Sequence, residues 1–318
     1  MRFTSLLALG LLPVFATAGA AAPLDCQKPS SDRDRVICSD KYLSEAVEKV
    51  DQGFAAAQAL LSADGRRQLQ DSQATWQRAL ETMCAVKSGG DITRCIGILY
   101  RDRAGDLTAI QRKGPFIFSR VDRYDVVGAA PDLFLRHVAY PQIDVPSTPV
   151  EKQWNAEAAQ KWPPVKGAIC DGREGDVTFG YSLGLATDRL INLNWWDWYF
   201  CHGAAHGFGG NSVETKLLQP TLRLLEPADL FRSDSGWRER LSALALAIIV
   251  KANGGPLAEH HEKNAVDGAA DPRHWLLRPD GLQIIYGLYS LGPYAFNPDV
   301  LVPWSGLKDV IVANPPIP

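Results

Sequence analysis

The sequence predicts an α+β protein, in which a disulfide-stapled bundle of three helices precedes an antiparallel sheet domain with one long packed helix. Three observations lead to this class. Apolar residues recur every three to four positions between residues 40 and 107, which is the period of an amphipathic helix. Strand-like runs separated by turn residues dominate from residue 177 onward. Six cysteines are available as staples.

Residues 1–20 have the features of a secretory signal peptide. Arg2 gives a positive start, and Ala18 and Ala20 form a small-x-small cleavage site. The apolar run 6–16 is shorter than the roughly 20 residues that span a membrane. We therefore expect a chain that is periplasmic or secreted, with no membrane insertion after signal removal. An even number of cysteines in such a compartment predicts three disulfides.

Residues 21–110 are predicted to form the helical domain. One apolar stripe runs over 43–61, a second over 69–83, and a third over 92–107 that includes Arg103. Short turns between them indicate an antiparallel bundle. Its four cysteines lie near the predicted helix ends: Cys26, Cys38, Cys84 and Cys95. Two local pairs, Cys26 with Cys38 and Cys84 with Cys95, fit this hairpin, and so does a cross-link from Cys38 to Cys84.

Residues 111–169 are predicted to be a linker and an irregular lead-in. Prolines recur there at positions 131, 141, 146, 149, 163 and 164. A short helix is expected around 151–161 only.

Residues 170–318 are predicted to form the α+β domain. Strands are expected at 177–185, 190–200, 213–218 and 221–225, with a hairpin turning at Asp280-Gly281 between 275–277 and 283–286. The long helix is expected at 237–251, capped by 233–235 and ended by Asn253-Gly254, and a short helix follows from Ser305. Cys170 and Cys201 remain for a third disulfide.

The helical domain also resembles a known family. Its four cysteines, Gln73-x-x-Trp76 and the run from Cys95 to Arg103 are similar to the LprI-like lysozyme-inhibitor N-terminal domain over about residues 24–110. That family commonly has an arginine four residues after the tryptophan, whereas this chain has Leu80. No role of that arginine is carried over.

The second domain resembles the extracytoplasmic domain shared by RsiV-type anti-sigma factors and PdaC-type peptidoglycan deacetylases, over about residues 170–315. The resemblance rests on Ala205-His206-Gly207, on 225–231 and on 275–307. We recognise neither a sigma-binding segment with its membrane helix nor a deacetylase catalytic domain. Neither parent activity is therefore expected.

Two other features bear on function. His202 and His206 are a candidate zinc pair, with a third ligand from 259–262, but the surrounding glycines favour a strand-ending bend, and we expect no metal and no cofactor. The run 259–262 itself is expected to be a solvated loop. Trp195, Trp196, Trp198 and Tyr199 must alternate between the two faces of a strand. One face is expected in the core, and the other is a candidate surface for stacking on the sugars of peptidoglycan.

We expect a binding protein rather than an enzyme, because no nucleophile motif is present. A net charge of −3 does not favour nucleic acid as a partner. The two resemblances together imply a lysozyme-binding protein that inhibits lysozyme by occluding its cleft. Its contacts are expected from Tyr289, Pro293, Tyr294 and His206. A peptidoglycan-binding module is the alternative, followed by a zinc-dependent hydrolase.

Overall fold

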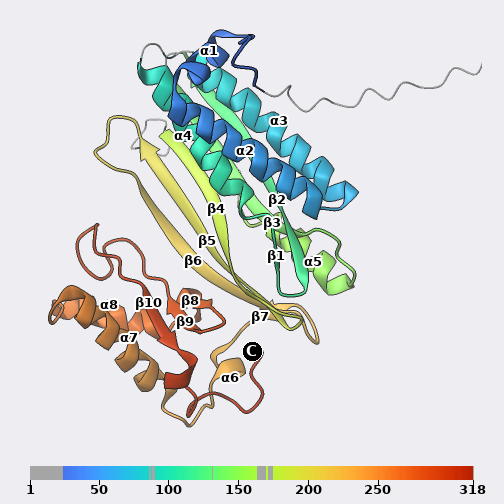
Figure 1. The fold of residues 1–318 in the computed structure, drawn as a ribbon. Helices are drawn as coiled ribbons and strands as arrows, with labels where there is room; N and C mark the ends of the chain where they lie inside the picture. Colours follow the sequence, from blue (N-terminus) through green and yellow to red (C-terminus); the bar gives the residue numbers. More distant parts are fainter. Residues whose placement is uncertain are drawn as a thin grey trace, which may run out of the picture.

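The computed structural model describes residues 24–85, 87, 90–130, 132–162, 170 and 175–317. The predicted signal peptide, Pro131, Pro163 and Pro164 lie outside these residues. The predicted α+β class is confirmed. Figure 1 shows the N-terminal helices lying along the long strands of one sheet, with a second, smaller group of helices and strands at the far end of that sheet.

The N-terminal helices are α1 (Asp32–Ser39), α2 (Lys41–Leu60), α3 (Ala63–Ala85) and α4 (Gly90–Leu107). The last three are the predicted bundle, and α1 is an additional short helix. Asp40 begins α2 by accepting hydrogen bonds from the backbone N–H groups of Tyr42 and Leu43. The disulfides are the local pairs, Cys26–Cys38 and Cys84–Cys95.

The large sheet has seven strands in the order β1 to β7. They are β1 (Gln111–Lys113), β2 (Phe116–Ala129), β3 (Asp132–Ile143), β4 (Gly175–Ala186), β5 (Leu190–Cys201), β6 (Phe208–Leu217) and β7 (Arg223–Leu224). All neighbours are antiparallel except β3 and β4, which pair in parallel over Arg136–Val138. The predicted Cys170–Cys201 disulfide is present at the end of β5.

The prediction of an irregular lead-in over 111–169 is wrong. That segment supplies β1, β2 and β3 together with helix α5 (Pro149–Ala158), and only α5 was expected. Pro141 is tolerated in β3 because it lies beyond the three residues that pair with β4, so no ladder bond on that side is lost. The helices are not a separate unit either, since Tyr124 of β2 belongs to the same apolar core as Leu69 and Ile96.

The C-terminal unit contains α6 (Pro227–Leu230), α7 (Trp237–Asn253), α8 (Glu259–Ala269), the 3₁₀ turns Pro272–His274 and Trp304–Gly306, and a sheet of β8 (Trp275–Leu277), β9 (Gly281–Ile284) and β10 (Val300–Pro303). The predicted hairpin and the glycine end of α7 are confirmed, with Gly254 at φ 74°. The predicted serine cap of α7 is wrong, because Gly236 precedes it in a left-handed conformation. The predicted loop at 259–262 is also wrong, because it opens α8.

Asn192 joins the two sheets. This fully buried side chain of β5 donates to the carbonyl oxygen of Trp275 at 3.0 Å and accepts from the backbone N–H of Leu277 at 2.8 Å. Leu190 and Leu217 of the large sheet pack in the same core as β8 and α7. The C-terminal unit therefore completes its core with residues of the large sheet.

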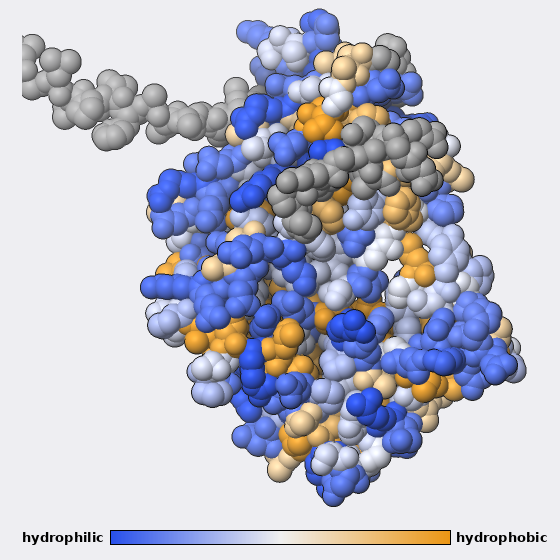
Figure 2. All heavy atoms as spheres, turned by 180° about the vertical axis from the view of Figure 1, so that it is seen from behind, coloured by the Kyte–Doolittle hydropathy of each residue, from blue (hydrophilic) through white to orange (hydrophobic). Residues whose placement is uncertain are grey.

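The surface is mixed in character. Figure 2, which views the molecule from behind, shows a mainly hydrophilic face on which apolar residues appear in small separate groups. In the part of the chain that the structure describes, no helix combines the length and the apolar character needed to cross a membrane. The three disulfides fit a non-cytoplasmic, oxidising compartment.

We predict that replacing Cys84 and Cys95 together by serine lowers the free energy of unfolding by about 3 kcal/mol, because the bridge removes the closure entropy of a short loop from the unfolded chain. Denaturant unfolding of the oxidised proteins measures this loss. The sequence separation is 12 for Cys26 and Cys38 and 11 for Cys84 and Cys95. Replacing Cys26 and Cys38 together by serine should therefore lower the free energy of unfolding by a similar amount. A Cys38–Cys84 bridge in non-reducing peptide maps would contradict the pairing.

Candidate functional site

The structure brings together the four residues predicted to contact a partner. The ring of Tyr294 stacks on His206 with centroids 4.6 Å apart, and the ring of Tyr289 lies 5.7 Å from Tyr294. Pro293 is exposed beside Tyr294. His206 comes from the bend between β5 and β6, and the others come from the loop between β9 and β10. We call His206, Tyr289, Pro293 and Tyr294 the aromatic patch.

The loop that carries Tyr289, Pro293 and Tyr294 is anchored by hydrogen bonds to α8. The carbonyl oxygen of Ser290 accepts from Nδ1 of His261 and from Nδ2 of Asn264, both at 3.0 Å, and both donors belong to α8. Leu291 is buried in the C-terminal core. Tyr289 has a φ of 62°, which a non-glycine residue rarely adopts, and its side chain is 51% exposed. The patch is thus held in place while its rings remain accessible.

The two histidines of the predicted zinc alternative do not share a site. Nε2 of His202 lies 3.0 Å from Oδ2 of Asp176, and its ring contacts Phe134. Nδ1 of His206 donates to the carbonyl oxygen of Gly207 at 2.9 Å. Among the described residues, neither histidine belongs to a cluster of three possible metal ligands. His206 thus bonds to a backbone carbonyl of the predicted bend, whereas His202 pairs with a carboxylate of β4.

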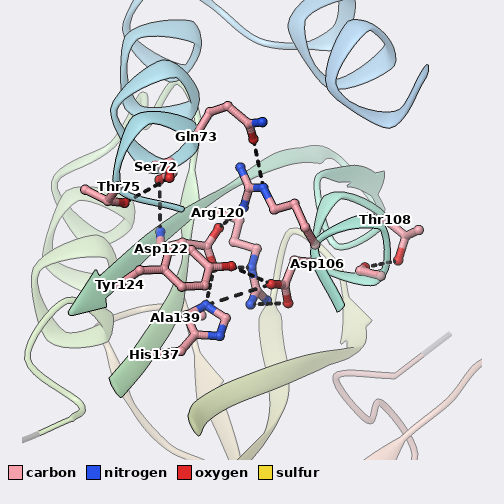
Figure 3. Close-up of polar contacts among 12 residues, drawn as sticks. Ser72, Gln73, Thr75, Asp106, Thr108, Arg120, Asp122, Tyr124, His137 and Ala139 are labelled. Atoms are coloured by element: carbon pink, nitrogen blue, oxygen red, sulfur yellow. Dashed lines mark hydrogen bonds and ion pairs between the residues drawn. The ribbon is translucent and has the colours of Figure 1, made fainter. Parts of the chain in front are cut away.

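A buried charged network between the helices and the sheet was not predicted from the sequence. Asp122 of β2 is its centre, with a side chain only 1% exposed. Its Oδ2 accepts from Nη1 of Arg103 at 2.9 Å, and its Oδ1 accepts from Nε of Arg120 at 2.7 Å and from Nε2 of His137 at 2.9 Å. Figure 3 shows Arg120, Asp122 and His137 converging below α3 and α4.

A second carboxylate extends the network. Asp106 of α4 accepts from Nη2 of Arg120 at 2.6 Å and from the hydroxyl of Tyr124 at 2.8 Å. Helix α3 contributes Ser72, whose hydroxyl accepts from the backbone N–H of Asp122 at 3.0 Å, as Figure 3 shows. The network therefore connects α3, α4, β2 and β3.

These contacts set the charges. Burial by itself would raise the pKa of the Asp122 carboxyl, but Arg120, the hydrogen bond from His137 and Arg103 together hold that pKa far below its usual range. Burial, reinforced by Asp122 and Asp106, raises the pKa of Tyr124 well above its usual value. The carboxylate is thus ionised and the phenol protonated at neutral pH.

Asp106, Asp122 and His137 are also close enough to one another to hold a metal ion. Both oxygens of Asp122 are already used by two guanidinium groups and an imidazole, and Asp106 is used by Arg120 and Tyr124. A cation placed there would have to displace buried arginines of the same charge. The network is better explained as a set of ion pairs than as a metal centre.

A cavity of about 290 Å³ lies above this network. Its floor includes a row of side chains that are register partners across four strands: Tyr124, His137, Thr178 and Trp198. The remaining lining residues come from α3, α4, β3 and β5, namely Trp76, Leu99, Asp102, Arg103, Asp106, Leu135 and Trp196. The predicted alternation of the tryptophans is observed, because Trp195 is 2% exposed in the core while Trp196 and Trp198 line the cavity.

One signal in the sequence pointed to the network. Arg103 falls on the apolar stripe of its helix, and an arginine in such a stripe must be paired if it is buried. Its partners could not be found from the sequence, because Arg120 and Asp122 alternate as a solvated strand face would.

Comparisons with known proteins identify the C-terminal part. Residues 228–305 match the family model described as "Protein of unknown function (DUF3298)". Among solved structures, a DUF3298 family protein from Pseudomonas aeruginosa is 15% identical with a TM-score of 0.48, over 65% of this chain and 98% of its own. A second, from Bacteroides fragilis, is 16% identical with a TM-score of 0.43, over 64% and 96%. No curated protein matches.

The matched residues contain Tyr289, Pro293 and Tyr294 but not His206. They also lie outside residues 24–110, so the resemblance of the helical part to LprI-like domains stays a prediction.

We predict that Asp122→Asn lowers the free energy of unfolding by about 3–5 kcal/mol at pH 7, because buried Arg103 loses its carboxylate partner and buried Arg120 is left with Asp106. Chemical denaturation measures the change. Asp102→Asn is the matched control, since Asp102 is exposed and, among the described residues, pairs with exposed Arg101. It should change stability by less than about 0.5 kcal/mol. Equal effects of the two variants would contradict the role of Asp122.

The depressed pKa of Asp122 also predicts a pH dependence. A carboxyl with a lowered folded-state pKa contributes its full stability above its unfolded value, about 3.9, and loses it as the pH falls toward the folded value. The difference in the free energy of unfolding between the unsubstituted chain and Asp122→Asn should therefore be constant between about pH 5 and 7 and become smaller below about pH 4. A difference in stability that becomes larger on acidification would contradict a lowered folded-state pKa of Asp122.

Proposed function

We propose that this chain is an exported lysozyme-binding protein that inhibits lysozyme by placing the aromatic patch in the enzyme's cleft. The observation that carries the proposal is the patch itself, in which Tyr289 and Tyr294 of an anchored, exposed loop lie beside His206 of the β5–β6 bend, ring against ring. The choice of partner rests on the two family resemblances of the sequence.

Two physical properties of the patch favour contact with a protein: the large contact area of its tyrosine rings and the ordering of its loop before binding. Tyrosine adds a large contact area with few rotatable bonds, which is why it is frequent at binding hot spots. The hydrogen bonds from α8 to Ser290 hold the loop before binding, so less ordering is required when a partner arrives. An ordered aromatic surface of this kind suits a concave partner.

The character of the patch also suits the proposed partner. A lysozyme cleft carries two catalytic carboxyl groups between walls that bind sugar rings. The patch contains no carboxylate, and it offers two phenol hydroxyls and an imidazole as polar groups. Aromatic rings fill the space of sugar rings, and the phenols can donate to carboxylates. Inhibition then follows from exclusion of the glycan, without a bond being made or broken.

Lysozyme activity assays with the purified mature chain test the proposal, together with calorimetric binding to several lysozyme types. We expect inhibition at micromolar concentrations, and a loss of about tenfold or more in affinity for Tyr294→Ala and for Tyr289→Ala.

Tyr42→Ala is the matched control, since Tyr42 is 82% exposed on α2, outside the patch. It should inhibit like the unsubstituted chain. Absence of binding to every lysozyme type would refute the proposed function. Inhibition that survives both patch variants but is lost in Tyr42→Ala would place the contact on the helices instead.

A further inference from the structure

Two hydrogen-bond donors of residues that line the cavity above the buried network are not used by any residue that the structure describes. Nη2 of Arg103 and Nε1 of Trp76 are buried and have no hydrogen-bond partner among the described residues. Both side chains line the cavity, and both residues are at least 98% buried. Buried donors without a partner are costly, so a site with two of them is suited to a ligand that brings an acceptor.

The charge around these donors is already balanced. Arg103 and Arg120 are matched by Asp106 and Asp122, which leaves the network neutral. Asp102, which also lines the cavity, is exposed and pairs with Arg101. An anionic ligand would gain no net attraction and would lie near two carboxylates. A neutral acceptor, such as an amide carbonyl, fits the donors better.

The opposite side of the cavity carries two indole rings that lie flat on the sheet. A Cβ atom on Gly180 would come within 2.3–2.7 Å of three ring atoms of Trp196. A Cβ atom on Gly207 would come within 2.5 Å of two ring atoms of Trp198. The glycines are therefore what allow each ring to lie against the backbone, with its other face turned away from the sheet. Flat, half-buried indoles provide surfaces on which the C–H faces of a sugar can stack.

From these observations we propose that the cavity binds an N-acetylated amino sugar, either free or as the end of a cell-wall glycan. The pyranose ring stacks on Trp196 and Trp198. The acetamido carbonyl oxygen accepts from Nη2 of Arg103 and Nε1 of Trp76, and its methyl group contacts Leu99 and Leu135, which also line the cavity. A volume of about 290 Å³ is just below the roughly 300–1,000 Å³ of sites for drug-sized ligands, which suits one sugar ring.

This site is separate from the aromatic patch. Its residues belong to α3, α4 and β2 to β5, whereas the patch belongs to the bend before β6 and to the loop after β9. The two sites share no residue, but Trp198 packs against Gly207, the neighbour of His206. Trp196 rests instead on Gly180 of β4. Trp196 is therefore the residue through which the sugar site is tested apart from the proposed lysozyme contact.

The test is ligand-observed NMR and calorimetry of the mature chain with N-acetylglucosamine, its short oligomers and glucose. We expect a dissociation constant on the order of 1 mM for the monosaccharide and no measurable binding of glucose, which lacks the acetamido group. Trp196→Ala and Trp198→Ala should each weaken binding by about tenfold or more. Trp76→Phe removes the indole N–H while keeping a ring, and it should reduce the preference for N-acetylglucosamine over glucose.

Tyr294→Ala is the control for the other site and should bind the sugar normally. Trp196→Ala should inhibit lysozyme normally, because the ring of Trp196 rests on Gly180 and not on the bend. Near-ultraviolet circular dichroism and the melting temperature check that Trp198→Ala is folded. Three results would overturn the sugar site: no binding of any N-acetylated probe, equal binding of glucose, or unchanged binding in folded Trp198→Ala. Pull-down by purified peptidoglycan that requires Trp198 would identify the cell wall as the source, and binding of free sugar alone would identify soluble fragments.

Discussion

The carboxylate of Asp122 joins the helical layer to the sheet, and the arrangement above it depends on that group. It pairs with an arginine of its own strand, an arginine of α4 and a histidine of β3 in a place that water does not reach. Removing charges from water is costly, and buried ion pairs often add little to stability over an apolar core. We infer that this network chiefly fixes where α4 lies on β2, since an apolar contact would allow the helix to shift.

That fixed position has a chemical result. Arg103 donates from Nε to Gln73 and from Nη1 to Asp122, so its orientation is determined, and Nη2 has no hydrogen-bond partner among the described residues. Tyr124 and His137 are paired across β2 and β3, and the same row of paired residues continues across β4 to Trp198 of β5. The groups that stabilise the packing thus also shape one wall of the cavity, in the way that well-supported sites are built on rigid elements.

Features with a local cause could be predicted from the sequence, and features with a distant cause could not. The Asp280-Gly281 hairpin, the glycine end of α7 and the strands β4 and β5 all follow from neighbouring residues. Strand β2 was missed because its inward positions hold Arg120 and Asp122, whose burial depends on α4. Helix α8 was missed because its buried residues are small, namely Ala265, Gly268 and Ala269, and leave little apolar period. The patch residues were named in advance, but the stacking of His206 on Tyr294 joins chain positions that no local pattern relates.

Asn192 shows that the C-terminal unit is not structurally independent of the large sheet. The segment that matches the DUF3298 model spans 228–305. The backbone of its first strand, β8, is hydrogen-bonded to the side chain of Asn192, which lies outside that segment. The unit also covers Leu190 and Leu217, which would be open to water without it. The matched segment therefore does not contain its whole core. In this chain it depends on the large sheet, whose buried amide and apolar end complete the core of the C-terminal unit.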